Sequence, residues 1–196
     1  MICLSVHKNG VFVCNAGMPG LAILTATIRA SRYDAAAGSV DITGLQDLPD
    51  QRSAQVAWVR DSLLKPGDSL VFILINHDEP DAPIDVKPRD SAALLPAPHE
   101  QDTLHQAPAA SGSLLPPLHA SLAFKLAAGN QEVTARLPDS DGHMACTLLW
   151  DKWQPERCTI SASSSPGMAN GDQDKHTQWL EAELQVGDSF EFTVLD

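Results

Sequence analysis

Residues 58–74 read WVRDSLLKPGDSLVFIL, and residues 179–195 read WLEAELQVGDSFEFTVL. Both stretches open on a tryptophan, continue to a Gly-Asp-Ser tripeptide and end in alternating apolar residues. Alternation with a period of two is typical of a half-buried β-strand, and a glycine before it suits a tight turn with positive φ. The repeat therefore predicts that the chain contains two copies of one β-rich unit.

The residues that match between the two copies receive structural roles. We expect the tryptophans to anchor the core, and the apolar pairs that follow at i, i+4 predict one short helical turn in each copy. We expect the Gly-Asp pairs to shape the turn before the closing strand, where an aspartate accepts backbone N–H groups. The predicted structural residues are Trp58, Gly67, Asp68, Trp179, Gly187 and Asp188. The i, i+4 pairs are Val59 with Leu63 and Leu180 with Leu184.

A fainter match upstream extends the repeat over most of each copy. Residues 20–28 align with 142–150, and residues 39–43 align with 157–161. A repeat of this length indicates duplication of a compact module rather than a solenoid of short units. We therefore expect a mainly β fold of two homologous antiparallel sandwich or barrel modules, of about five strands each, related by a pseudo-twofold axis. The expected boundaries are a first module at 1–90, a Pro/Ala-rich linker at 91–118 and a second module at 119–196.

The first copy opens on a predicted β-hairpin. Asn9 and Gly10 lie between two β-prone runs, which suits a two-residue type I′ turn. That turn places Val6 opposite Val13 and puts Cys14 on the other face of the hairpin.

The first copy also carries a set of short motifs in a fixed order. They are Asn9-Gly10, Val13-Cys14-Asn15-Ala16-Gly17, Leu24-Thr25-Ala26, Thr43-Gly44-Leu45, Trp58-Val59 and Lys65-Pro66-Gly67-Asp68-Ser69-Leu70. In these motifs the sequence resembles a tandem duplication of small single-module bacterial proteins of unassigned function. The second copy keeps well only the closing Trp-Leu and Val-Gly-Asp-Ser portion. The resemblance implies kinship of fold and brings no set of catalytic residues.

The formal charge of the 196-residue chain is −12. The first module carries −3, the linker −2 and the second module −7, so most of the acidity belongs to the second copy. No cluster of Lys and Arg is present to neutralise phosphates, which argues against nucleic acid or an anionic membrane as a partner. Two interpretations of the acidity stay open: it keeps the protein soluble, or it forms a docking surface for a basic partner.

The amino-terminal stretch and the cysteines bear on location. Lys8 and its polar neighbours interrupt residues 1–14 where a signal peptide has an unbroken apolar core. No apolar run approaches the ~18 residues of a membrane span. Four cysteines lack the density of a disulfide scaffold. We therefore expect a soluble cytoplasmic protein with reduced thiols.

The sequence lacks the usual signatures of catalysis. No P-loop, dinucleotide-binding glycine motif, nucleophile elbow or His-Glu-x-x-His occurs. His143 and Cys146 would point to opposite faces of a strand, so they do not converge with Cys158 on a metal ion. The acidic stretches 138–143 and 170–174 resemble fragments of calcium loops but lack the closing glutamate, and weak calcium binding stays open. We predict no catalytic residue, no metal and no cofactor.

The favoured function is that of a non-enzymatic protein-binding module. An immunity protein or inhibitor would mask the active site of a basic bacterial toxin with an acidic surface, because opposite charge speeds association. The residues predicted to contact that partner are Asp139, Asp141, Asp172, Asp174, Glu181 and Glu183.

Three other classes of function stay open. One is an enzyme whose site is assembled from scattered residues, with His7, His77 or His143 taking part. Another is a carbohydrate-binding or ligand-binding β module, for which a row of exposed aromatic rings is typical. The third is a homodimer that pairs through edge strands. The aromatic candidates for a sugar platform are Tyr33, Trp150 and Trp153.

Overall fold

The chain is all-β in a computed structural model that describes residues 1–49, 52–89, 118–119, 121–137, 141–166 and 177–195. The strands of the first copy are β1 (Ile2–Lys8), β2 (Val11–Ala16), β3 (Leu21–Ser31), β4 (Gly38–Asp47), β5 (Ser53–Leu64), β6 (Ser69–Asn76) and β7 (Asp85–Arg89). Those of the second are β8 (Ala123–Ala128), β9 (Gln131–Arg136), β10 (Asp141–Asp151), β11 (Arg157–Pro166), β12 (Thr177–Gln185) and β13 (Ser189–Leu195).

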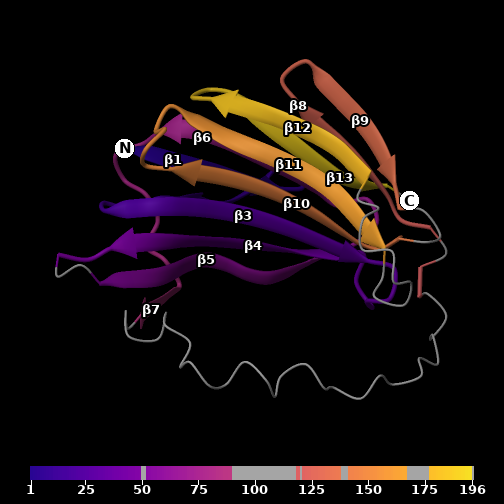
Figure 1. Cartoon of the computed structure of the whole chain (residues 1–196), viewed down its shortest axis with the longest axis horizontal. Helices are drawn as coiled ribbons and strands as arrows, with labels where there is room; N and C mark the ends of the chain where they lie inside the picture. Colours follow the sequence, from indigo (N-terminus) through magenta and orange to yellow (C-terminus); the bar gives the residue numbers. More distant parts are fainter. Residues whose placement is uncertain (50–51, 90–117, 120, 138–140, 167–176, 196) are drawn as a thin grey trace, which may run out of the picture.

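The strands form two antiparallel sheets, and each sheet contains strands from both copies. One sheet has the order β2-β1-β6-β13-β8-β9, and the other has the order β12-β11-β10-β3-β4-β5-β7. Figure 1 shows β3 of the first copy running beside β10 of the second. Strands from residues 1–90 and from residues 119–196 thus share both sheets of one two-layer sandwich, and neither sheet closes into a barrel.

The strand order is symmetric about the centre of each sheet. Strands β1, β2 and β6 occupy the positions of β8, β9 and β13, and strands β3, β4 and β5 occupy those of β10, β11 and β12. In the first sheet β6 and β13 meet at the centre, where Val71 pairs with Glu191. In the second sheet β3 and β10 meet at the centre, where Ala26 pairs with Leu148. Only β7 has no counterpart among the described residues.

The register places aligned residues at the same positions. Ile28 pairs with Val40 on β4, and the residues aligned with them, Trp150 and Cys158, pair with each other on β10 and β11. The faint upstream match in the sequence therefore corresponds to the same rungs of the two ladders.

One hydrophobic core lies between the sheets and draws on both copies. Phe72 of β6 stacks on Phe190 of β13 with ring centroids 6.1 Å apart, and Phe124 stacks on Phe192 at 5.3 Å. All four rings are fully buried. The Phe124–Phe192 stack lies within the second copy, whereas the Phe72–Phe190 stack joins the two copies, so the core is shared between them.

The predicted helical turns are wrong, because both stretches are strand. Spacing of i, i+4 falls on one face of a strand as well as of a helix, so the pattern did not distinguish the two. In β5 a bulge at Asp61, which has φ of 45°, shifts the register. As a result Leu63 is 60% exposed, and Leu64 is buried, as Leu184 is in β12.

The opening hairpin forms with the expected turn, and its register changes further in. Asn9 and Gly10 have φ of 54° and 75°, the positive values that a type I′ turn requires. A bulge between Val6 and His7 then places Val6 opposite Cys14 rather than Val13. Cys14 is therefore buried with Val6 in the core.

Candidate functional site

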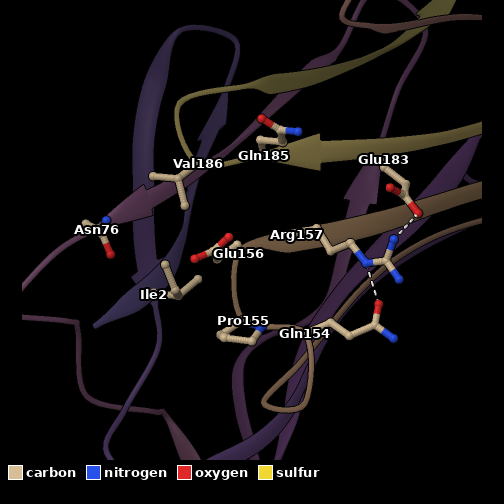
Figure 2. Close-up of a pocket in the computed structure, with 9 residues that line it drawn as sticks. All are labelled: Ile2, Asn76, Gln154, Pro155, Glu156, Arg157, Glu183, Gln185 and Val186. Atoms are coloured by element: carbon tan, nitrogen blue, oxygen red, sulfur yellow. Dashed lines mark hydrogen bonds and ion pairs between the residues drawn. The ribbon is translucent and has the colours of Figure 1, made fainter.

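An open cleft of about 910 Å³ lies at one end of the sandwich (Figure 2). Three parts of the chain meet there: the start of β1 with the end of β6, the loop 152–156 between β10 and β11, and the turn between β12 and β13. The cleft is lined by Ile2, Asn76, Gln154, Pro155, Glu156, Arg157, Glu183, Gln185 and Val186. Carboxylates, amides and one guanidinium alternate with small apolar patches in this lining.

Arg157 is the only cation in the lining of this cleft, and its contacts hold it in place. It donates from Nη1 to Oε1 of Glu183 on the neighbouring strand at 2.7 Å. It also donates from Nε to Oε1 of Gln154. The carboxylate of Glu156 belongs to the same lining and carries no ion pair within the described parts of the chain.

The loop beside this cleft presents an exposed indole. Asp151 Oδ1 accepts the backbone N–H groups of Trp153 and Gln154 at 2.9 and 3.0 Å. The indole of Trp150 is buried and donates to the carbonyl of Pro155 at 2.9 Å. Trp153 is 69% exposed, and the Nζ of Lys152 lies 5.2 Å from the centroid of its ring. The loop is thus fixed at both ends and holds Trp153 toward solvent.

Of the six residues predicted to contact a basic partner, the structure places two side chains. Glu181 and Glu183 lie on the same face of the edge strand β12, and both are exposed. Asp141 begins β10, and its side chain is outside the described parts. Asp139, Asp172 and Asp174 also lie outside the described residues. The acidic surface that the structure describes is therefore centred on β12.

The Gly-Asp-Ser turns join the two copies crosswise. The N–H of Gly67 donates to the carbonyl of Val194 at 2.9 Å, and that of Gly187 donates to the carbonyl of Leu74 at 2.7 Å. Gly67 and Gly187 have φ of 84° and 98°. Each turn therefore fixes the closing strand of the other copy.

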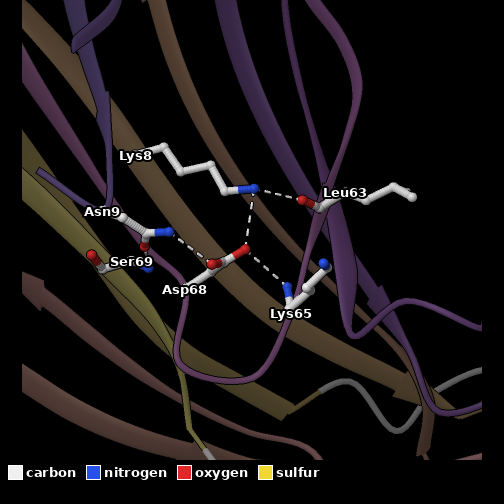
Figure 3. Close-up of polar contacts among 6 residues, drawn as sticks. All are labelled: Lys8, Asn9, Leu63, Lys65, Asp68 and Ser69. Carbon is white, nitrogen blue, oxygen red and sulfur yellow. Dashed lines mark hydrogen bonds and ion pairs between the residues drawn. The ribbon is translucent and has the colours of Figure 1, made fainter. Parts of the chain in front are cut away.

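Asp68 holds its turn through several contacts (Figure 3). Its carboxylate accepts the backbone N–H of Lys65 at 3.0 Å and the side-chain amide of Asn9 at 2.8 Å, and the Nζ of Lys8 lies 3.1 Å away. The bond from Asn9, followed by those from Lys65 and Lys8, lowers the pKa of Asp68. Asp188 accepts the equivalent N–H of Gln185 at 2.9 Å.

The two tryptophans differ in their surroundings. Trp58 is 4% exposed, and its indole N–H donates to the carbonyl of Asp81 at 2.8 Å. Trp179 is half-buried at the edge of the core. Bulges place Trp58 across from the Ile42/Thr43 step of β4 but Trp179 across from the Ala162/Ser163 step of β11. The two indoles therefore do not occupy equivalent rungs, in contrast to the expectation from the repeat.

The histidines do not form a catalytic pair with a carboxylate in the part that the structure describes. His143 lines a hollow of about 370 Å³ together with Asp34 and Ser165, but its ring contact is with Tyr33 at 6.4 Å. His7 lies 3.4 Å from the Ser5 hydroxyl and stacks edge-on against Phe12. His77 contributes backbone groups, which bond to Met1.

All four cysteines are buried free thiols. Burial raises the pKa of Cys3, raises that of Cys14 to about 11 and raises those of Cys146 and Cys158 to about 12. A thiol with such a pKa is a poor nucleophile at neutral pH. Within the described ranges no three His, Cys, Asp or Glu side chains converge into a group that would hold a metal ion.

No protein-family model, curated protein sequence or solved structure matches this chain. No helix long and apolar enough to cross a membrane occurs in the described residues.

Sequence reasoning missed the cleft and the loop that borders it. Ile2, Asn76 and Arg157 come together only because β6 and β13 share a sheet, and no local pattern signals that contact. The sequence WDKW at 150–153 was the one available signal, since an Asp before a short loop suits a turn.

Proposed function

We propose that this protein is a non-enzymatic, cytoplasmic protein-binding module of the inhibitor or immunity-protein kind, with a basic protein such as a toxin as its partner. The observation that carries the proposal is the pair of exposed carboxylates on the edge strand β12, Glu181 and Glu183. Glu156 adds a third carboxylate in the adjoining cleft. A rigid sheet that presents one sign of charge steers a partner of the opposite sign and raises the association rate.

The surroundings of these carboxylates support recognition rather than catalysis. Glu183 has one cationic partner, Arg157, and Glu181 has none among the described residues. Cationic side chains on a partner would be attracted to both carboxylates. The energy of such rim contacts falls as salt screens the attraction. The exposed Trp153 on the next loop is the kind of aromatic anchor that concentrates binding energy in protein interfaces.

The test is binding to the purified basic protein encoded beside this gene. We expect a complex whose dissociation constant rises steeply with salt and rises about tenfold or more in Glu181→Lys/Glu183→Lys. The matched control is Glu132→Lys/Glu191→Lys, which also removes one paired and one unpaired carboxylate, on the other sheet. A neighbour that does not bind, or equal binding by both double variants, would contradict the proposal.

A second function is supported by the cleft beside Trp153. Amides, carboxylates and an arginine next to an exposed indole match the chemistry that recognises a carbohydrate or another polar ligand. Titration calorimetry with neutral oligosaccharides would give heats that disappear in Trp153→Ala. Binding of this kind would be insensitive to salt, which separates it from the protein-binding function.

We also propose that the chain arose by tandem duplication and that the two copies are homologous units about a pseudo-twofold axis. The mirrored strand order, the equivalent register at Ile28 and Trp150 and the crosswise turn contacts support this origin. β7 and the loop 152–156 are then later departures of one copy from the other.

A further inference from the structure

The second sheet ends differently in the two copies. At one end, β7 pairs with β5 and covers its outer side. At the other end, β12 pairs with β11 alone, and no described strand continues the ladder beyond it. β12 contacts β8 and β9 of the other sheet without pairing with them. The first copy thus supplies its own strand to cover the edge of β5. In the second copy the equivalent edge, that of β12, has no such strand among the described residues.

The register shows where a strand on β12 would begin. Ala57 of β5 stands opposite Thr43, and Glu181 of β12 stands opposite Ser161. Thr43 and Ser161 are equivalent, since each follows an isoleucine that pairs with a residue of the central Ala26–Leu148 pair. Ile42 pairs with Ala26, and Ile160 pairs with Leu148. In the first copy the N–H of Ile84 donates to the carbonyl of Ala57 at 2.7 Å, and β7 follows directly. The equivalent acceptor in the second copy is the backbone of Glu181.

A hollow lies at this position in the second copy. Its volume is about 500 Å³, and it extends from the edge strand over β11. It is lined by Gln131, Thr159, Ile160, Ser161, Glu181, Ala182 and Glu183. The hollow therefore lies over β11 and β12 at the level of the Ser161–Glu181 pair, beside the edge that an added strand would use.

Charge defines the chemistry of the occupant. In the first copy the strand that receives β7 carries a cation: Arg60 of β5 lies 3.2 Å from the carboxylate of Asp85 on β7. In the second copy the exposed charges on the edge strand are the carboxylates of Glu181 and Glu183. An incoming strand needs Lys or Arg at alternate positions to face them. A second copy of β12 would instead oppose carboxylate to carboxylate, which disfavours self-pairing.

We propose that β12 is a docking edge for an extended basic segment of the partner, which adds antiparallel to it as β7 adds to β5. The main-chain bonds of the added strand supply affinity, and Glu181 and Glu183 select basic side chains. This inference rests on the proposed function and specifies how the partner binds.

The probe is a synthetic peptide of residues 82–89 that carries Asp85→Lys, because this segment already pairs with the equivalent edge in the native chain. Hydrogen exchange of the full-length protein is followed by mass spectrometry with and without millimolar peptide. We expect slower exchange in peptic fragments that contain β12, with affinity about tenfold lower for Glu181→Lys/Glu183→Lys and unchanged for Glu132→Lys/Glu191→Lys. The peptide without the substitution should bind more weakly, because its aspartate faces the carboxylates.

Three results would overturn the inference. They are absence of protection in β12 at saturating peptide, equal affinity for the two double variants, and a dimer in solution whose β12 is protected without peptide. The same footprint taken with the purified basic partner separates the two proposals. If the partner binds without protecting β12, the proposed function stands and strand addition is wrong. If the protein binds the peptide but no basic partner, strand addition at β12 stands and the proposed function is wrong.

Discussion

The two Gly-Asp-Ser turns have the same backbone in different surroundings. Both glycines have positive φ, both aspartates accept the N–H three residues back, and both turns bond to the closing strand of the other copy. Around the first turn, Lys8 and Asn9 add side-chain contacts to Asp68. In the second copy position 129, equivalent to Asn9, is a glycine without a side chain to donate. Contacts that hold the two copies together are thus kept in both, while contacts within one copy have diverged.

The same contrast separates the two ends of the seven-stranded sheet. β5 is covered by β7 and carries Arg60, whereas β12 is uncovered in the described structure and carries Glu181 and Glu183. The first copy stabilises its edge and the second leaves its edge accessible. Under the proposed function, the first copy has a mainly structural role and the second copy has a recognition role.

The largest expected effect tests whether the copies share one folding unit. Phe190→Ala removes a ring that is fully buried against Phe72, and we expect it to lower the free energy of unfolding by about 3–5 kcal/mol. Chemical denaturation should remain a single transition, with tryptophan fluorescence and far-ultraviolet circular dichroism coincident. Phe12→Ala, at an exposed position, is the control and should change little. Two separate transitions would show that the copies fold independently.

The next effect tests the equivalence of the turns. Gly67→Ala and Gly187→Ala each place a Cβ on a residue with positive φ, although no atom lies within 4 Å of either added carbon. We expect a loss of about 1–2 kcal/mol for each, from the backbone conformation alone. Asn tolerates positive φ better than Ala does, so the corresponding Asn variants should lose less. Losses that differ strongly between the two positions would contradict equivalence.

A smaller effect should separate the two aspartates. Asp68→Asn removes a charge that Lys8 and Asn9 stabilise, and we expect a loss of about 1 kcal/mol at pH 7. Because the pKa of Asp68 is lowered on folding, its contribution is full above the unfolded value of about 3.9 and is lost as pH falls through the lower folded value. The thermal midpoints of Asp68→Asn and the native protein should therefore converge in acid. Asp188→Asn should cost less at pH 7, and a cost as large as that of Asp68→Asn would contradict the difference between the turns.

The smallest effect concerns the ion pairs at the two edges. Arg157 and Glu183 are both about half exposed, so solvent screens their attraction. We expect Arg157→Gln to change the free energy of unfolding by less than about 0.5 kcal/mol, and Arg60→Gln in the first copy to behave similarly. Denaturation midpoints measure both. A loss above about 1 kcal/mol at Arg157 would indicate that the pair has a structural role in the cleft.

Local features of the fold followed from the sequence because they depend on local chemistry. The period of two after Gly67 and Gly187 gave the closing strands, and Asn9-Gly10 gave the first turn. The i, i+4 pairs misled because four is a multiple of two, so helix and strand share that spacing. β7 gave no strand signal, since Pro88 cannot donate to a ladder and charged residues occupy three of its five positions.

The joining of the copies and the candidate site could not be derived from patterns of this kind. Nothing in β6 or β13 alone indicates that Phe72 and Phe190 will be neighbours, because each strand also pairs within its own copy, β6 with β1 and β13 with β8, and local patterns do not identify the partner on the second edge. The cleft at Arg157 depends on that pairing. Glu181 and Glu183 were identified from charge, but the unpaired edge beside them is a property of the assembled sheet.

The crosswise bonds of the two turns have a consequence for evolution. A chain of one unit would leave the central edges of both its sheets exposed, and two such chains would satisfy each other through an isologous interface of the same rungs. Under the proposed duplication, single-unit ancestors would have been obligate dimers, and gene fusion would have converted a quaternary contact into a tertiary one. Fusion also frees the two halves from symmetry, so that a binding edge can evolve on one side only.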